Sequence, residues 1–210
     1  MLFYDKIFEK SGIDCWRLFE CSWIDTKGRP QQGLFEIYLE NNSEAINTFE
    51  LKNILRNLAH QEFSKEEEVL LFFQQLLKPL APNCHVRMIN PQFPPVHPIS
   101  HLPGTYYKTN AVRFICALSK QPFNGELHIT FAQPLNDYRL INQFVLETRS
   151  KEFMQADFID NLKSKLQSLR QSYVLSLHIA RRGGISYQAI RWFEYPFLEP
   201  KSLLSLSPLE

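Results

Sequence analysis

The first third of the chain alternates apolar and polar residues in a way that predicts a β-hairpin. Residues 16–23 and 34–40 have strand character, and apolar side chains occupy every second position at the centre of the latter segment. Residues 26–30, which separate them, are rich in turn-forming residues. The two segments are therefore expected to pair as neighbouring strands.

Two helices and a closing strand are expected next. Apolar residues at helical spacing form one stripe, made of Leu51, Ile54, Leu55 and Leu58. Ser64, followed three residues later by Glu67, has the spacing of a capping box and predicts the start of a second helix. Cys84, Val86 and Met88 then alternate with polar neighbours, which indicates a strand.

The second half of the chain repeats this order of elements. Leu127, Ile129 and Phe131 alternate with polar residues, so we expect a strand with one buried face. Residues 112–116 are its predicted hairpin partner. The remaining elements are two helices, with apolar stripes over residues 140–145 and 158–169, and a strand over residues 173–180.

A proline-rich stretch separates the two similar halves. Residues 90–104 hold five of the 13 prolines, and proline neither continues a helix nor donates to a sheet. We therefore expect an α+β protein with an N-terminal module at residues 1–90, a linker at 91–104 and a C-terminal module at 105–210. Each module is expected to be an antiparallel sheet with a helix pair on one face. Exposed sheet edges favour a homo-oligomer or pairing with a partner subunit.

Composition and charge exclude several classes of function. With 44% apolar residues among 210, the chain can bury a core. The net charge of +1 provides no overall field toward nucleic acid or an anionic membrane. No apolar run approaches the roughly 18 residues of a membrane span, the chain start does not resemble a signal peptide, and four scattered cysteines lack metal-site spacing. We expect a cytoplasmic protein that binds no nucleic acid, membrane or metal.

A few residues are candidates for chemistry on local pattern alone. Cys116 ends a predicted strand, where a thiol is either reactive or, as in most buried free cysteines, simply packed. Arg181 and Arg182, followed by two glycines, suit either close approach to a phosphate or an ordinary basic hairpin. Glu50 and Gln155 each stand near a predicted helix start, where carboxylates and amides are common.

Five segments, in order along the chain, carry a family resemblance. They are residues 16–30 (WRLFECSWIDTKGRP), 50–53 (ELKN), 114–122 (FICALSKQP), 152–155 (EFMQ) and 181–185 (RRGGI). Together they resemble the tandem NADPH-dependent 7-cyano-7-deazaguanine reductases, the nitrile reductases of queuosine biosynthesis. The resemblance extends over residues 12–192.

This resemblance implies a fold and a chemistry. The fold is the tunnelling fold (T-fold) in two tandem modules, with a site between them for a purine-like or pterin-like ring. The implied roles are: Cys116 as the nucleophile that adds to the nitrile carbon to form a thioimide; Glu50 and Gln155 in substrate binding; Lys52, Arg181 and Arg182 in cofactor binding. NADPH would reduce the thioimide to the amine in two hydride steps.

Several family positions differ in this chain. The acidic residue seven positions after the cysteine is Phe123 here, the family histidine is Met154, and the ring-binding glutamate is Gln155. A positioned proton donor contributes about 10²- to 10⁴-fold in rate, so NADPH-dependent reduction is expected to be impaired. An amide at position 155 still offers a donor and an acceptor to a heterocycle edge, so binding is expected to persist.

Three hypotheses follow for function. The first is a diverged reductase-like protein that binds a deazapurine-like or related heterocycle, with Cys116 as its nucleophile. The second is a non-catalytic binding or assembly subunit of the same fold. The third is an active nitrile reductase in which His128 or His178 replaces the missing acid. The first and third hypotheses predict that Cys116 faces a cavity beside Glu50 and Gln155. The second hypothesis predicts that the Cys116 sulfur is packed in the core.

Overall fold

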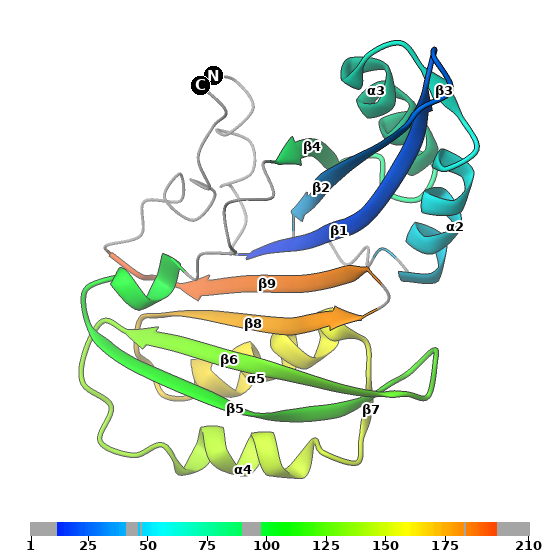
Figure 1. Ribbon diagram of the computed structural model, residues 1–210. Helices are drawn as coiled ribbons and strands as arrows, with labels where there is room; N and C mark the ends of the chain where they lie inside the picture. The colour runs from blue at the N-terminus through cyan, green and yellow to red at the C-terminus, as the bar shows by residue number, and fades with distance from the viewer. Residues whose placement is uncertain (1–11, 41–45, 47, 90–97, 183, 197–210) are drawn as a thin grey trace. The chain divides into compact units, whose positions relative to one another are not determined.

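The computed structural model describes residues 12–40, 46, 48–89, 98–182 and 184–196. These residues form two compact units. The N-terminal unit contains the described part of residues 15–94 together with residues 181–186, and the C-terminal unit contains residues 12–14, 98–180 and 187–196. Each unit mixes helices with a largely antiparallel sheet, in agreement with the predicted α+β class (Figure 1).

The N-terminal unit places two helices beside a small sheet. Its strands run in the order β4-β2-β1, and β3 pairs in parallel with β1. The elements are β1 (Gly12–Asp25, with its first three residues in the other unit), β2 (Pro30–Glu40), α2 (Thr48–Leu58), β3 (Glu62–Phe63), α3 (Glu66–Leu77) and β4 (His85–Ile89). Phe35 of β2 stacks on Phe73 of α3 with ring centroids 5.4 Å apart, which fixes this helix against the sheet.

The predicted hairpin is confirmed, and its turn is held by one carboxylate. Asp25 accepts hydrogen bonds from the backbone N–H groups of Lys27 and Arg29, each at 2.9 Å. Gly28 closes the turn at φ +73°, a backbone conformation that side chains disfavour. The Asp25 carboxylate therefore orders the turn between β1 and β2.

The start of α3 differs from the predicted capping box. Helix α3 begins at Glu66, one residue later than the Ser64 pattern implies. The third helical residue is therefore Glu68, and its carboxylate accepts hydrogen bonds from the backbone N–H and the hydroxyl of Ser64, at 2.9 and 2.6 Å. The predicted capping box is therefore not formed: the N-cap residue is Lys65, which makes no side-chain cap hydrogen bond, and Ser64 instead donates to Glu68.

The C-terminal unit is built on a larger sheet. Its strands run in the order β9-β8-β6-β5-β7. The elements are η1 (Pro98–His101), β5 (Thr105–Cys116), β6 (Pro122–Phe131), α4 (Arg139–Glu147), β7 (Glu152–Phe153), α5 (Gln155–Gln167), β8 (Tyr173–Arg182) and β9 (Ile185–Phe193). The predicted strands and helices of this half are present, while β7 and β9 add strands that the alternation did not reveal.

A β-bulge in β5 decides which side chains face the helices. Thr109 pairs with Leu127, but the next recorded pair is Val112 with Gly125, so β5 contains one extra residue. This shift places Val112, Phe114 and Cys116 on the same face as Leu127. Phe114 stacks there on Phe158 of α5, with ring centroids 4.9 Å apart.

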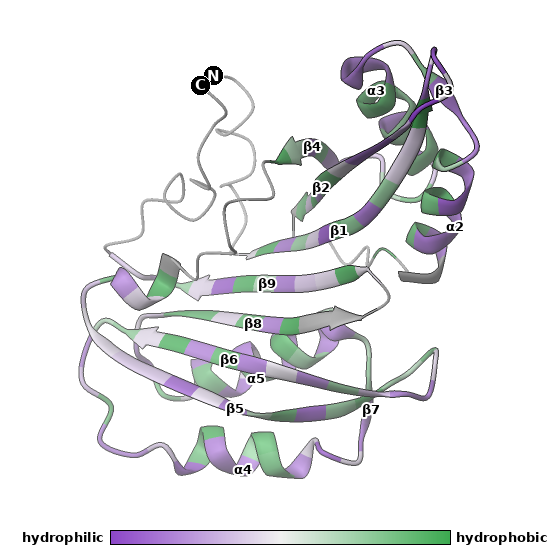
Figure 2. Cartoon of the chain, viewed as in Figure 1, coloured by the Kyte–Doolittle hydropathy of each residue, from purple (hydrophilic) through white to green (hydrophobic). Residues whose placement is uncertain are grey.

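Helices α4 and α5 cover this face through their apolar stripes. The apolar and polar residues of both helices alternate at helical spacing in Figure 2. The buried helix residues are Ile141, Phe144, Val145, Phe158, Ile159, Leu162 and Leu166. Their burial confirms the two stripes predicted from sequence.

The opposite face of β6 is also buried, contrary to the predicted single buried face. His128 and Thr130 alternate with Leu127 and Ile129, yet they are only 2% and 0% exposed. The cause is tertiary: residues 98–101 form η1, and the Thr130 hydroxyl donates a 2.6 Å hydrogen bond to the backbone carbonyl of Ile99. Residues 90–97 of the expected linker lie outside the described part of the chain.

Candidate functional site

Cys116 is the last residue of β5 and is held by a tight turn. Its side chain lies on the helix-covered face, and the residue is 8% exposed. Its backbone carbonyl accepts a hydrogen bond from the backbone N–H of Lys120 at 2.9 Å, and Lys120 closes the turn at φ 55°. The backbone N–H of Ser119 points at the Cys116 sulfur, with N and Sγ 3.4 Å apart. The sulfur therefore accepts a weak hydrogen bond from the turn that follows the strand.

The start of α5 lies next to this turn. Cys116 and Phe153 are paired residues in the parallel contact between β5 and β7, and the N–H of Ala117 donates to the Phe153 carbonyl at 3.1 Å. Gln155, two residues later, is the first residue of α5. We call residues 116–120 and 152–155 the Cys116 corner. It joins two of the sequence candidates, Cys116 and Gln155, within the C-terminal unit.

The side-chain amide of Gln155 is available for hydrogen bonding at this corner. Gln155 is half-buried, and no described residue hydrogen-bonds to its side-chain amide. The first turn of a helix also carries backbone N–H groups without helical acceptors. An amide here can present one acceptor and one donor group to a planar heterocycle.

The two positions that differ from the family's proton donors carry apolar side chains. Phe123 pairs with Phe114 across the β5–β6 hairpin, and their rings lie 5.5 Å apart. Met154 is the residue before α5 and is half-buried. The carboxylate of Glu152 is bound to Lys120 at 2.5 Å, so it is neutralised by a cation in this arrangement. The corner therefore pairs a thiol with an amide and two apolar side chains.

His128 and His178 do not compensate for this loss within the same chain. His128 pairs with Lys108 of β5, which places it roughly 25 Å along the sheet from Cys116 at about 3.3 Å per residue. His178 pairs with Glu126 and is more than about 15 Å away on the same reckoning. Both histidines also lie on the sheet face opposite Cys116. The expectation that either one acts as a substitute acid beside Cys116 is therefore wrong for a single chain.

The N-terminal unit holds the other two candidates with described side chains. Glu50 is exposed in the first turn of α2, and Lys52 is half-buried two residues further on. Lys52 lines a hollow of about 340 Å³ between β1 and α2. The other lining residues are Glu20, Ser22, Leu55, Arg56 and Ala59. Two cations face one carboxylate there, which is a charge balance that suits an anion.

The Arg181-Arg182 candidate is described only in its backbone. Both residues end β8, and their side chains lie outside the described part of the structure, as does Gly183. Gly184 has φ +77°, and a Cβ at this position would lie 2.7 Å from the carboxylate of Glu20. The glycine therefore serves a close approach between this turn and β1 of the N-terminal unit.

A buried ion cluster gives a structural role to Arg17, which lies in the first of the five resembling segments, residues 16–30. Arg17 lies 2.5 Å from the Glu36 carboxylate, and Arg87 lies 2.7 Å from it. Burial alone would raise the pKa of Glu36, but its attraction to both arginines outweighs burial and lowers the pKa. Arg17, in segment 16–30, thus has a structural role in joining β1 to β2.

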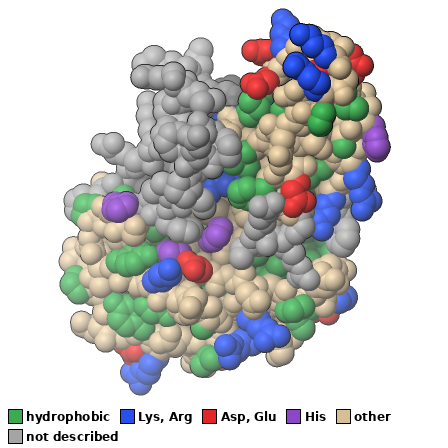
Figure 3. Space-filling view, viewed as in Figure 1, with side chains coloured by type: hydrophobic (Ala, Val, Ile, Leu, Met, Phe, Trp, Pro, Cys, Tyr) green, Lys and Arg blue, Asp and Glu red, His purple; other side chains and the backbone are tan. Residues whose placement is uncertain are grey.

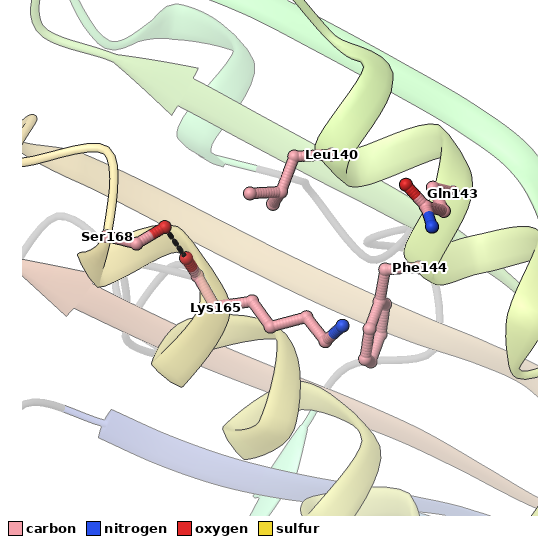
Figure 4. Close-up of a pocket in the computed structure, with 5 residues that line it drawn as sticks. All are labelled: Leu140, Gln143, Phe144, Lys165 and Ser168. Atoms are coloured by element: carbon pink, nitrogen blue, oxygen red, sulfur yellow. Dashed lines mark hydrogen bonds between the residues drawn. The ribbon is translucent and has the colours of Figure 1, made fainter.

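A second hollow lies between the outer sides of α4 and α5 and is separate from the Cys116 corner. It measures about 440 Å³ and is lined by Leu140, Gln143, Phe144, Lys165 and Ser168 (Figure 4). Lys165 places its ammonium 5.6 Å from the centre of the Phe144 ring. These contacts are those of an ordinary helix pair, with the lysine covering an aromatic ring.

Comparison with known proteins matches the N-terminal part of the chain. Residues 4–87 match the family described as nitrile reductase, 7-cyano-7-deazaguanine-reductase N-term. This match shows that the N-terminal part of the chain is similar to the N-terminal module of the nitrile reductase family. The matched range includes Arg17, Glu50 and Lys52.

No helix in the described segments is long and apolar enough to cross a membrane. Within those same segments, no group of three or more His, Cys, Asp and Glu side chains is placed to hold a metal ion.

Sequence reasoning missed a polar group on the sheet face of the C-terminal unit that lies opposite α4 and α5. Tyr106, Lys108, Glu126 and His128 come from two neighbouring strands and interact with one another. The signal was present in the alternation, because Glu126 and His128 occupy the polar positions of β6. Only the register of β5 against β6 shows which residues face them.

Proposed function

We propose that this chain is a diverged nitrile reductase-like protein that binds a deazapurine-like or related heterocycle at the Cys116 corner. In this proposal Cys116 adds to the nitrile carbon: the sulfur–carbon bond forms, the thiol proton passes to nitrogen, and a thioimide results. The corner that joins Cys116 to Gln155 is the observation that carries the proposal.

The local contacts support binding of a planar ring. The Ser119 N–H is directed at Sγ, which holds the sulfur in a defined position at the corner. The Gln155 amide can recognise a ring edge that presents one donor and one acceptor. A carboxylate, as found in the family, accepts only, so the change to glutamine favours a ligand with a different edge pattern. Glu50 is proposed as a further ligand-binding residue.

Reduction is proposed to be slow because the acid positions are apolar. Loss of a positioned acid costs about 10²- to 10⁴-fold in rate, or roughly 3 to 5 kcal/mol of barrier. Phe123 packs its ring on Phe114, and Met154 has no ionisable group. The thioimide is therefore the proposed end point, or a slowly reduced intermediate.

NADPH binding is proposed through cations of the N-terminal unit, which includes the end of β8. Lys52 and Arg56 line the same hollow as Ser22, which fits one phosphate in charge and hydrogen-bonding type. Arg181 and Arg182 are the further proposed cofactor contacts. When bound, NADPH would supply the hydride. The proposed architecture is two tandem T-fold modules that assemble as a homo-oligomer or with a partner subunit.

The test is incubation of the full chain with 7-cyano-7-deazaguanine followed by intact-mass measurement. The expected result is a mass gain of one nitrile molecule in the wild type and none in Cys116→Ala. Cys84→Ala is the matched control, because Cys84 is a half-buried free cysteine of the other unit. It should keep the adduct. No adduct in the wild type would overturn the covalent step for this nitrile.

NADPH consumption in the same mixture separates binding from reduction. We expect an adduct with little or no loss of NADPH absorbance. Rapid NADPH consumption would overturn the proposed impairment, and it would require a proton donor other than His128 or His178 of the same chain.

A non-catalytic binding or assembly subunit is the second candidate. The 8% exposure of Cys116 favours it, since a packed sulfur needs no chemical role. The same experiment distinguishes the two, because this candidate predicts no adduct in the wild type or in either variant.

A further inference from the structure

Four side chains form a continuous polar chain on the sheet face of the C-terminal unit that lies opposite α4 and α5. The Tyr106 hydroxyl lies 2.5 Å from Nδ1 of His128, and Nε2 of His128 lies 3.3 Å from a carboxylate oxygen of Glu126. The ammonium of Lys108 lies 3.1 Å from the same Glu126 oxygen. In Figure 3, His side chains lie beside basic and acidic side chains on the face in view.

Burial varies along this chain in an ordered way. The imidazole of His128 is enclosed, with a side chain only 3% exposed, whereas the side chains of Glu126 and Lys108 are 39% and 48% exposed. Tyr106, at the opposite end, is 39% exposed. A buried imidazole thus connects two groups that reach solvent.

The network assigns the positions of the protons. Glu126 is ionised, because a hydrogen bond from Lys108 lowers its pKa. A carboxylate only accepts, so Nε2 of His128 carries the hydrogen that it donates to Glu126. Burial lowers the pKa of His128, which keeps the ring neutral near pH 7. Nδ1 is therefore the acceptor for the Tyr106 hydroxyl.

This order of groups matches that of a nucleophile, a base and an orienting carboxylate. We propose that Tyr106, His128 and Glu126 form a second proton-transfer site, in which the Tyr106 oxygen acts as a general base toward a small ligand with a weakly acidic O–H or N–H. The ligand proton passes to the Tyr106 oxygen while the Tyr106 proton passes to Nδ1 of His128. The imidazolium so formed is neutralised by Glu126, and the ligand anion lies near the ammonium of Lys108.

This site is separate from the Cys116 corner and does not depend on the proposed function. The two lie on opposite faces of the sheet, with His128 about 25 Å along it from Cys116. Substitution of Cys116 should leave Tyr106 unaffected. The two proposals can therefore fail independently.

A small aryl sulfonyl fluoride tests the site without knowledge of its ligand. In the labelling reaction the Tyr106 oxygen bonds to sulfur, the sulfur–fluorine bond breaks, fluoride leaves, and the phenol proton passes to His128. Tyr107 is an internal control, because it lies on the other face and donates its hydroxyl to Asn142 at 2.7 Å. Rates at both tyrosines are measured by peptide mapping of the full chain.

We expect Tyr106 to react at least about tenfold faster than Tyr107, since positioned proton acceptors contribute about 10²- to 10⁴-fold. His128→Gln should reduce the Tyr106 rate to near that of Tyr107, and Glu126→Gln should reduce it several-fold. Equal rates in the wild type, or unchanged rates in folded variants, would overturn the proposal. If His128→Gln does not fold, Glu126→Gln decides, because this side chain is partly exposed and its loss is expected to be tolerated.

Discussion

Cys116 lies opposite Phe153 in the parallel pairing of β5 with β7, two residues before Gln155 begins α5. A thiol at the end of one strand and an amide at the start of a helix are thus brought to one corner of the C-terminal unit. The short strand β7 is responsible for this, because its two residues align the end of β5 with the first turn of α5.

Gln155→Leu is expected to weaken binding of 7-cyano-7-deazaguanine about tenfold. Loss of one or two ordinary hydrogen bonds costs about 1 to 1.5 kcal/mol, which corresponds to this factor. Isothermal titration calorimetry in a Cys116→Ala background measures the affinity without adduct formation. Gln167→Leu, an exposed change at the other end of α5, should leave affinity unchanged. Equal affinities for all three proteins would remove Gln155 from the binding site.

Phe123→Asp is expected to raise NADPH-dependent reduction, because it restores a carboxyl group at the family's acid position. The gain should be about tenfold or more, the lower range for a positioned acid that has not been optimised. Phe123→Asn is the matched control, since it has similar size but cannot donate an acidic proton. Both variants should lose roughly 1 to 3 kcal/mol of stability through the lost contact with Phe114. If Phe123→Asn raised the rate as much as Phe123→Asp, the carboxyl group at position 123 would not be acting as the acid.

Arg191→Leu is expected to destabilise the C-terminal unit strongly. Arg191 is fully buried and lies 3.0 Å from a carboxylate oxygen of Asp14 and 2.7 Å from one of Asp160. Removal of one partner from a buried ion pair costs about 3 to 5 kcal/mol, because the remaining charge is left uncompensated. Urea unfolding gives the free energy of unfolding. Arg139→Leu, which breaks an exposed pair with Asp137, should cost no more than about 1 kcal/mol.

The turn between β1 and β2 should lose its stabilisation in acid. Hydrogen bonds from the backbone and side chain of Arg29 lower the pKa of Asp25 from 3.8 to about 2. A lowered folded-state pKa means that the contribution is complete above pH 4 and disappears as the pH falls through about 2. Asp25→Asn should therefore be less stable than the wild type at neutral pH, with the difference shrinking between pH 4 and 2. Glu67→Gln, an exposed change in α3, should show no such convergence in thermal unfolding.

Several features followed directly from residue order. The alternation over residues 16–40 corresponds to β1 and β2, and the stripes of α4 and α5 face the sheet, because a periodic pattern of apolar residues has few ways to be buried. The motif order also led to the nitrile reductase family, which the match over residues 4–87 supports.

Features that depend on one inserted residue or one neighbouring strand could not be predicted. The bulge between Thr109 and Val112 determines the face on which Cys116 lies. The alternation of apolar and polar residues does not indicate where a single extra residue is inserted in a strand. The alternation of β6 suggested an exposed face, but η1 covers it and encloses Thr130.

The sequence by itself determined the two helix pairs, most of the long strands and several residues that could carry chemistry, because local spacing sets which side chains share an element. Tertiary structure alone decided which of them meet. It joined Cys116 to Gln155, removed His128 and His178 from their vicinity, and connected His128 to Tyr106, because strand register and sheet face are set by packing between segments far apart in the chain.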